Sequence, residues 1–206
     1  MWALPPVDPG FEISVATQGM SKGLLQSNGP QIVSRATLKS GQFQLGGQWK
    51  NISTNSAKGE ASAIAGWSRR SGSFDLGLSA AYKVLTSASG SGNRSSVELS
   101  GTVGRKVGNV SLKGSAVFSP NDLGSTRQSL YVEGGPSFDL PAKFKLSANI
   151  GHRWRQRSPN YTSFNIGVSR QVLKVLTADV RLYDTDEGEL GRNYDRRVVG
   201  SLKLAL

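Results

Sequence analysis

Polar and apolar side chains alternate, residue by residue, along most of this chain. Successive side chains of a β-strand point to opposite faces, so strict alternation predicts strands with one polar and one apolar face. No stretch keeps a 3.6-residue period long enough to predict a helix. In "GQFQLGGQWK", residues 41–50, the apolar parity holds Phe43, Leu45 and Trp49, and the polar parity holds Gln42, Gln44, Gln48 and Lys50.

Twelve segments of this kind follow one another, and the connections between them alternate in length. Six connections are long, polar and rich in Gly, Asn and Ser, such as "LTSASGSGNR" at 85–94, whereas short turns such as Ser40-Gly41 lie between them. Gly, Asn, Asp and Pro supply the backbone geometry that turns require. The twelve segments are 10–19, 30–39, 41–51, 60–69, 72–84, 95–104, 108–118, 127–136, 142–153, 161–169, 173–183 and 196–206.

An even number of strands joined alternately by long and short connections is the layout of an outer-membrane barrel. Strands of about ten residues cross a bilayer when they are tilted. Closure pairs every backbone amide, as lipid requires, and leaves no exposed edge. We therefore predict an all-β fold, a single antiparallel up-and-down transmembrane β-barrel of twelve strands over residues 10–206. Residues 1–9 would form a short periplasmic segment, the short turns would be periplasmic and the longer loops extracellular.

A soluble sandwich or a lipocalin-like barrel would show the same alternation with its apolar face turned inward. Several features favour the membrane barrel over this alternative. Only 37% of the residues are hydrophobic, the long and short connections are asymmetric, and the last strand ends in Leu206. No apolar run approaches the roughly 20 residues of a membrane helix. The absence of Cys excludes disulfides and thiolate sites.

The first residues, "MWALPPVDPG", have neither the basic start nor the long apolar core of a signal peptide. Either the protein is cytosolic or Met1 stands where a signal peptide has been removed. The barrel interpretation requires the second case and places the protein in the bacterial outer membrane.

Aromatic residues lie near several strand ends on the apolar parity. Amphipathic rings at this depth form the girdles that flank the apolar band of membrane barrels. Aromatic residues at the rim of a soluble core are the alternative, but five separate strands carry them here. The predicted girdle consists of Trp49, Trp67, Tyr82, Phe118 and Trp154.

The segment "MSKGLLQSNGPQ" (20–31) resembles the TorF-like porin family (Gcw_chp) of proteobacterial outer-membrane proteins. The family pattern after the first strand is Arg-Gly-x-Ser-Gln, three variable residues and Pro. Lys22 and Gly23 take the places of Arg-Gly here, and Gln26 and Pro30 take those of Gln and Pro.

Later segments continue the resemblance in the same order along most of the chain. "GQFQLGGQW" follows where the family has a Gly-aromatic-x-x-Gly strand, and "YVEGGPSFDLP" (131–141) and "LYDTDE" (182–187) are similar to two further family segments. The aromatic residue before Arg-Gly is absent, and Leu206 replaces the usual terminal aromatic residue. The resemblance implies the barrel, and with it a porin-like role.

The polar parity becomes the barrel interior if the apolar parity faces lipid. Twelve strands lie between the eight that leave room only for side chains and the sixteen to eighteen that enclose an aqueous channel. Unpaired bases in such a lumen would concentrate anions, and the net charge of +11 also favours anionic partners. The predicted pore-lining residues are Arg35, Lys50, Lys83, Lys113, Lys145, Arg153, Arg181 and Lys203, with Glu12, Glu60, Asp75, Glu98, Glu133 and Asp179.

Two functions follow from these residues. The first is a porin-like channel for the passive diffusion of small anionic solutes. In the second, the acids pair with the bases and plug the lumen, which leaves a structural barrel that binds lipopolysaccharide or a partner.

Two loop segments carry clustered charges. "HRWRQR" (152–157) offers arginines for the phosphates of lipopolysaccharide, although a solvated loop is an equal reading. "DTDEGELGRNYD" (184–195) bunches four acids but lacks the full calcium-loop signature, so a solvated acidic loop is favoured and no metal is predicted. The residues of interest are Arg153, Trp154, Arg155 and Arg157 in the first segment and Asp184, Asp186, Glu187 and Glu189 in the second.

Catalysis and nucleic-acid binding find little support. The single histidine, His152, has outward parity near the rim, and Trp154 stands where the lipid A deacylases that this arrangement resembles carry Ser. A general base needs a partner within hydrogen-bond reach, and none lies nearby in the sequence. The bases are scattered along strands, and no basic helix or aromatic RNA-binding motif occurs. We therefore predict no enzyme, no cofactor and no nucleic-acid partner.

Overall fold

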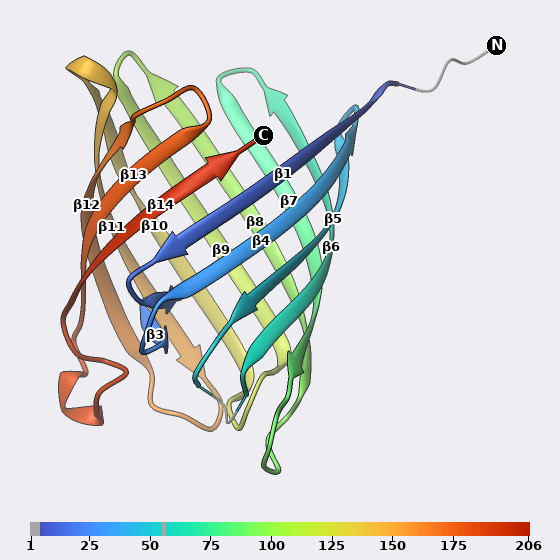
Figure 1. The fold of residues 1–206 in the computed structure, drawn as a ribbon, viewed down its shortest axis with the longest axis vertical. Coiled ribbons are helices and arrows are strands. Elements are labelled where there is room, and N and C mark those ends of the chain that lie inside the picture. Colours follow the sequence, from blue (N-terminus) through green and yellow to red (C-terminus); the bar gives the residue numbers. More distant parts are fainter. Residues whose placement is uncertain (1–4, 55–56) are drawn as a thin grey trace.

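The computed structural model describes residues 5–54 and 57–206. Twelve antiparallel strands close into one barrel (Figure 1), which confirms the predicted fold. Among the described residues, no helix is long and apolar enough to cross a membrane. The barrel strands are β1 (Val7–Ala16), β4 (Gln31–Ser40), β5 (Phe43–Asn51), β6 (Gly59–Ser71), β7 (Phe74–Thr86), β8 (Ser95–Val107), β9 (Val110–Asp122), β10 (Arg127–Leu140), β11 (Phe144–Arg155), β12 (Tyr161–Gln171), β13 (Leu176–Thr185) and β14 (Arg197–Ala205).

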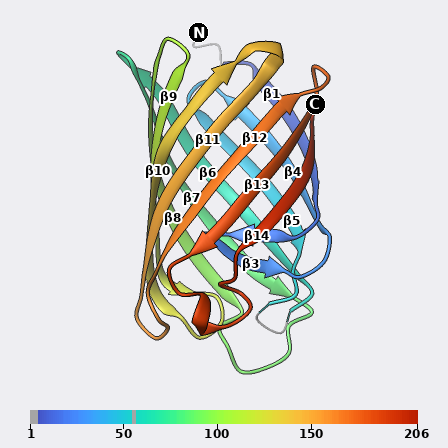
Figure 2. The same ribbon diagram turned by 90° about the vertical axis from the view of Figure 1, so that its left-hand side faces the viewer.

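The seam of the barrel joins β1 to β14, with Ile13 opposite Leu204. Beyond the ladder, Phe11 and Leu206 exchange two backbone hydrogen bonds of 3.1 and 2.9 Å. The start of β1 and the end of β14 lie at the same end of the barrel as the short turns, and the long connections lie at the other end (Figures 1 and 2). We call these the turn end and the loop end. Residues 1–4 of the predicted N-terminal segment lie outside the described residues.

The barrel is inverted relative to a soluble one, because its apolar parity faces outward. Phe43 is 68% exposed and Leu45 is 62% exposed, whereas Glu60 is only 1% exposed. Alternation continues around the circumference, so the outside is an apolar surface suited to lipid. The cluster of buried apolar residues lies instead among the loop-end connections, where Ile52, Ala57, Leu85 and Leu123 pack together.

Some strand boundaries differ from those expected. Gln42 lies in the turn after Gly41, whose φ is +59°, and its side chain accepts a hydrogen bond of 2.9 Å from Trp67 Nε1, so it is not on the luminal row. Strand β9 continues through Pro120 to Asp122, four residues beyond the predicted end at Phe118. Its ladder with β10 contains a bulge near Arg127, which absorbs the irregularity.

The largest difference lies in residues 17–30, where the first strand was expected to run to residue 19 and a polar loop was expected over residues 21–29. They contain a two-stranded hairpin, β2 (Gly19–Ser21) and β3 (Leu24–Ser27), at the loop end (Figure 1). Its two-residue turn, Lys22-Gly23, has φ values of 50° and 80°, the left-handed conformation that tight hairpins require. Short 3-10 turns, η1 (Pro141–Lys143) and η2 (Gly188–Leu190), complete the described elements.

Candidate functional site: the ion-paired barrel interior

The tip of the β2–β3 hairpin lies inside the barrel. Tyr161 on β12 donates a hydrogen bond of 2.5 Å from its hydroxyl to the carbonyl oxygen of Lys22. A Cβ atom on Gly23 would lie 2.2 Å from Ser163 Cβ, so the turn sits directly against the β12 wall. Farther along, Leu25 N donates to Asn193 O at 3.1 Å, which ties the hairpin to the last long loop. The hairpin is therefore a fixed part of the interior.

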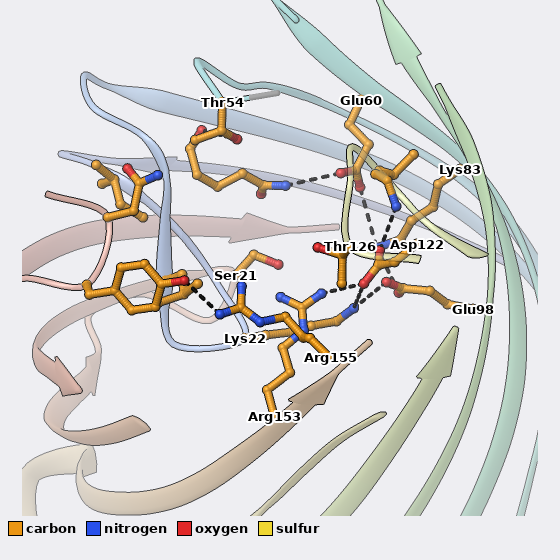
Figure 3. Close-up of a pocket in the computed structure, with 16 residues that line it drawn as sticks. Ser21, Lys22, Thr54, Glu60, Lys83, Glu98, Asp122, Thr126, Arg153 and Arg155 are labelled. Carbon is orange, nitrogen blue, oxygen red and sulfur yellow. Dashed lines mark hydrogen bonds and ion pairs between the residues drawn. The ribbon is translucent and has the colours of Figure 1, made fainter. Parts of the chain in front are cut away.

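The Lys22 ammonium group reaches two luminal carboxylates (Figure 3). Its Nζ lies 2.5 Å from Glu98 Oε1 on β8 and 3.8 Å from Asp122 Oδ2 on β9. Burial lowers the pKa of Lys22 and the charge of Arg153 acts in the same direction, while Asp122 and Glu98 oppose the shift. The two carboxylates thus stabilise the charged ammonium form at this position.

Ion pairs continue from the hairpin tip around the wall. Glu98 Oε2 lies 2.7 Å from Lys83 Nζ, and Asp122 pairs with Arg153. Glu60, almost fully buried, lies 3.2 Å from Lys50 Nζ and 3.6 Å from Lys83 Nζ. We call this set the luminal network, and it consists of the four cations Lys22, Lys50, Lys83 and Arg153 and the three carboxylates Glu60, Glu98 and Asp122.

Neutral side chains hold the carboxylates of the luminal network in place. Ser129 Oγ donates to Asp122 Oδ2 at 2.6 Å, and Gln26 Nε2 of the hairpin donates to Glu60 Oε2 at 3.1 Å. Two polar atoms here have no hydrogen-bond partner among the described residues, although they are buried: Gln26 Oε1 and Arg153 Nε. These atoms can bind water or a polar solute.

Two cavities meet at the luminal network. A cavity of about 180 Å³ at the loop end is lined by Lys22, Arg153, Arg155 and Tyr194 among others (Figure 3). A second cavity, of about 280 Å³, is lined by the polar strand residues Arg35, Gln44 and Gln48. Lys83 and Glu98 line both cavities, so their ion pair stands between them.

A third cavity of about 410 Å³ lies along the seam, between Met20 of the hairpin and Lys203 of β14. Arg181 lines this cavity and donates to Asn165 Oδ1 at 2.7 Å and to Ser147 Oγ at 2.8 Å. Asp179 Oδ2 lies 3.1 Å from the same guanidinium group. This part of the lumen is less densely paired than the luminal network.

The structure brings five of the fourteen predicted pore-lining residues together in the luminal network: Lys50, Lys83, Arg153, Glu60 and Glu98. The others are spread toward the turn end. Arg181 pairs with Asp179, Lys203 lies 3.7 Å from Glu12, and Lys145 lies 3.3 Å from Asp139.

Four predicted residues remain. Asp75 pairs with Arg70 at the exposed rim, and Glu133 accepts a hydrogen bond from the Tyr131 hydroxyl. Arg35 donates to Gln48, and Lys113 makes no ion pair within the described part of the chain. That these residues line a conducting pore remains a prediction.

Sequence reasoning missed Lys22 and Asp122, which complete the luminal network. Lys22 stood in the family-like motif but in a loop, where nothing local indicates that it turns inward. Asp122 follows "SPN", which reads as a turn because Pro120 interrupts the alternation. Tyr131 and Tyr161 share the luminal parity, and this signal was available in the sequence.

The charged loop segments are largely engaged within the protein. Arg153 turns inward to Asp122, while Arg155 stacks on Tyr161 and Tyr194 with its Cζ atom 4.8 and 5.7 Å from the ring centroids. Arg157 remains exposed.

In the acidic loop, Asp184 Oδ2 lies 2.6 Å from Arg196 Nη2. Asp186 accepts a 2.7 Å hydrogen bond from Thr162 N. His152 lies on the outer face beside Thr162 Oγ1 at 3.0 Å, with its ring 4.5 Å from that of Trp154. No Asp or Glu of the described residues is hydrogen-bonded to this imidazole.

The predicted aromatic girdle is unevenly distributed. Trp49, Tyr82, Phe118 and Trp154 occur near the loop ends of their strands, whereas Trp67 lies near the turn end of β6. Further exposed rings near the turn end are Phe43, Phe74, Phe138 and Phe144.

Residues 5–203 match the family described as "Bacterial protein of unknown function (Gcw_chp)". The chain belongs to the Gcw_chp family. The resemblance drawn from the sequence is thereby confirmed. Comparison with curated proteins gave no match.

The fold of this Gcw_chp chain is shared with solved porins. The KdgM porin superposes with a TM-score of 0.64 at 10% identity, over 95% of this chain and 98% of that chain. The NanC porin gives 0.60 at 7% identity, over 95% and 97%. The COG4313 outer membrane channel from Pseudomonas putida F1 gives 0.55 at 14% identity, over 98% and 96%. These identities show the fold alone, which is that of outer-membrane porins.

Proposed function

We propose that this Gcw_chp barrel is inserted in the bacterial outer membrane and conducts small anionic solutes by passive diffusion. The short turns would face the periplasm and residues 10–206 would form the membrane barrel, which β1 extends back to Val7. Of the predicted periplasmic segment 1–9, the residues before Val7 would then remain outside the barrel wall. The fourteen predicted pore-lining residues, together with Lys22 and Asp122, would line the path.

The observation that carries this proposal is the imbalance of pairing inside the barrel. Each luminal carboxylate of the network lies within 4 Å of at least one cation, and so do Glu12, Asp139 and Asp179. Among the described pore-lining acids, Glu133 alone has no such cation, and it accepts a hydrogen bond from Tyr131 instead. Arg35 and Lys113, by contrast, have no carboxylate partner within the described chain. Unpaired cations in a low-dielectric passage attract anions and repel cations.

The ion pair between the two cavities is built from groups that can exchange partners. Lys83 and Glu98 separate the loop-end cavity from the next one. A solute carboxylate could replace Glu98 on Lys83, or Asp122 on Arg153, without leaving either cation bare. Conduction needs binding that is favourable enough for entry and weak enough for release, and exchangeable ion pairs meet both conditions.

A structural neighbour supports an anionic solute. The KdgM porin has been solved in complex with disordered oligogalacturonate, with a TM-score of 0.65 at 8% identity over 95% of this chain and 98% of that one. Oligogalacturonate is a polyanion. At this identity it indicates a class of solute, and the bases of this chain supply the physical reason.

Planar-bilayer recording of the purified barrel tests the proposal. In a tenfold KCl gradient, we expect a reversal potential that reports chloride permeating more readily than potassium. Small carboxylates should reduce the chloride current by competing for the same cations. A cation preference would overturn the proposal.

The ion-paired luminal network and the docked hairpin favour one second function, a plugged barrel whose loops bind lipopolysaccharide or a partner. Arg157, exposed at the loop end, would then contact lipid phosphate. Absence of any conductance from correctly folded protein, with lipopolysaccharide binding lost in Arg157→Gln, would support this function instead.

A further inference from the structure

The outer face of the barrel carries its positive charge at one end only. By alternation, Arg69, Arg105 and Arg170 are the cationic residues on the outward parity of the twelve described strands, and all three lie in the last residues before a short turn. Two acids share this parity, both at the loop end: Asp122 turns inward to Arg153, and Asp184 pairs with Arg196. Outward positive charge that is confined to the turn end favours the binding of an anion there.

Two of these guanidinium groups lie over exposed aromatic rings. Arg105 Cζ is 5.4 Å from the centroid of Phe74, and Arg170 Cζ is 4.8 Å from that of Phe144. Stacking uses the face of the guanidinium plane and leaves its N–H edge free for bidentate contact with an oxyanion. No ion pair of any of the three arginines is found within the described residues.

The surroundings of Arg170 are amphipathic. The neighbouring turns place Lys143 and Lys174 at the surface, and Leu173 beside them is 58% exposed. Asp139, a luminal acid at the turn end of β10, forms ion pairs with Lys106 and Lys145 and is therefore not a partner of Arg170. Apolar side chains next to unpaired cations match the boundary between acyl chains and phosphates of a lipid leaflet.

We propose that Arg69, Arg105 and Arg170 bind the phosphate groups of anionic glycerophospholipids in the leaflet on the turn side. The stacked rings of Phe74 and Phe144 fix the depth of the arginines at the phosphate level. This proposal depends on insertion of the barrel in a bilayer, and it is independent of whether the lumen conducts.

Native mass spectrometry of the full chain in neutral detergent tests the lipid site. Phosphatidylglycerol should be retained on the wild-type barrel in preference to zwitterionic phosphatidylcholine. The triple variant R69Q/R105Q/R170Q should lose this preference, with an affinity for phosphatidylglycerol about tenfold lower for each arginine removed, because each loses a charge-assisted contact. Arg192→Gln, which removes one exposed arginine in the last long loop at the loop end, is the matched control and should bind as the wild type does.

Retention of phosphatidylglycerol by the triple variant, or equal retention of both lipids by the wild type, would overturn the proposal. Displacement of the lipid by millimolar inorganic phosphate would also overturn it, because the site would then recognise free phosphate. If the triple variant fails to fold, Arg105→Gln and Arg170→Gln are tested singly, and each should lose one bound lipid. A conducting barrel without lipid preference would reject this proposal alone, whereas lipid preference in a barrel with no conductance would reject only the channel.

Discussion

Replacement of Lys22 by Gln should loosen the hairpin over the proposed path and change the ion selectivity of the channel. The wild-type luminal network holds four cations against three carboxylates, and Lys22→Gln leaves three against three. Glu98 would keep Lys83 at 2.7 Å, and Asp122 would keep Arg153. The network thus loses its net positive charge without leaving any carboxylate unpaired.

The hairpin would lose its strongest contact with the wall. Lys22 is only 11% exposed at its side chain, so its ion pairs count for more than those of a surface residue. A hydrogen bond to a charged group contributes about 1.5–3 kcal/mol. Because Lys22 borders a cavity, we expect its replacement to cost the lower end of this range. A loss of this size shifts the equilibrium roughly tenfold toward the undocked hairpin. The Tyr161 and Asn193 contacts remain, so docking weakens without disappearing.

Single-channel recording measures both effects. We expect a higher mean conductance with more frequent transitions between levels, together with a smaller preference for chloride. Lys58→Gln is the control, because Lys58 is an exposed loop-end lysine outside the luminal network. Unchanged conductance and selectivity in Lys22→Gln would refute the view that this residue holds the hairpin over the path.

Three further predictions follow from the same contacts. Glu60→Gln leaves Lys50 without its carboxylate partner and should lower the free energy of unfolding of the barrel by about 3 kcal/mol. Heat-modifiability gels should show a lower midpoint temperature of unfolding for this variant, and an unchanged one for Asp75→Asn at the exposed rim. Gly23→Ala should undock the hairpin and raise conductance, since the added methyl group would meet Ser163 at a position with φ of +80°, whereas Gly29→Ala has open space and should behave as the wild type does. Lys113→Glu should reduce the chloride preference with little change in stability, because no described carboxylate depends on this lysine; an unaltered reversal potential would contradict the assignment of Lys113 to the path.

The luminal network and the docked hairpin join parts of the chain that are distant in sequence. Lys22 and Glu98 are 76 residues apart, and Tyr161 lies 139 residues from the carbonyl that it contacts. Such contacts depend on barrel closure, since only a closed wall encloses the hairpin from β8, β9 and β12 at once. The site is therefore a property of the whole barrel.

The fold and the orientation of side chains could be predicted from the sequence, because the two-residue period of a strand is local. Phe43, Leu45 and Trp49 were assigned correctly to one face by counting alone, and a net excess of bases on the other face was visible in the same way. The strand number and the long and short connections were visible in the sequence pattern, and closure followed from the need to pair every backbone amide.

Which luminal charges meet was decided by tertiary structure. Alternation places Lys50, Glu60, Lys83 and Glu98 on the inner face, but the register between neighbouring strands sets their common height, and no single strand carries that information. The hairpin is the clearer case: "SKGLLQ" reads as a loop, and it turns inward because Glu98, Asp122 and Tyr161 offer partners that exist only once the wall has closed. The sequence by itself determined the barrel and its two faces, since these depend on neighbours along the chain, whereas the luminal network depends on neighbours across the lumen.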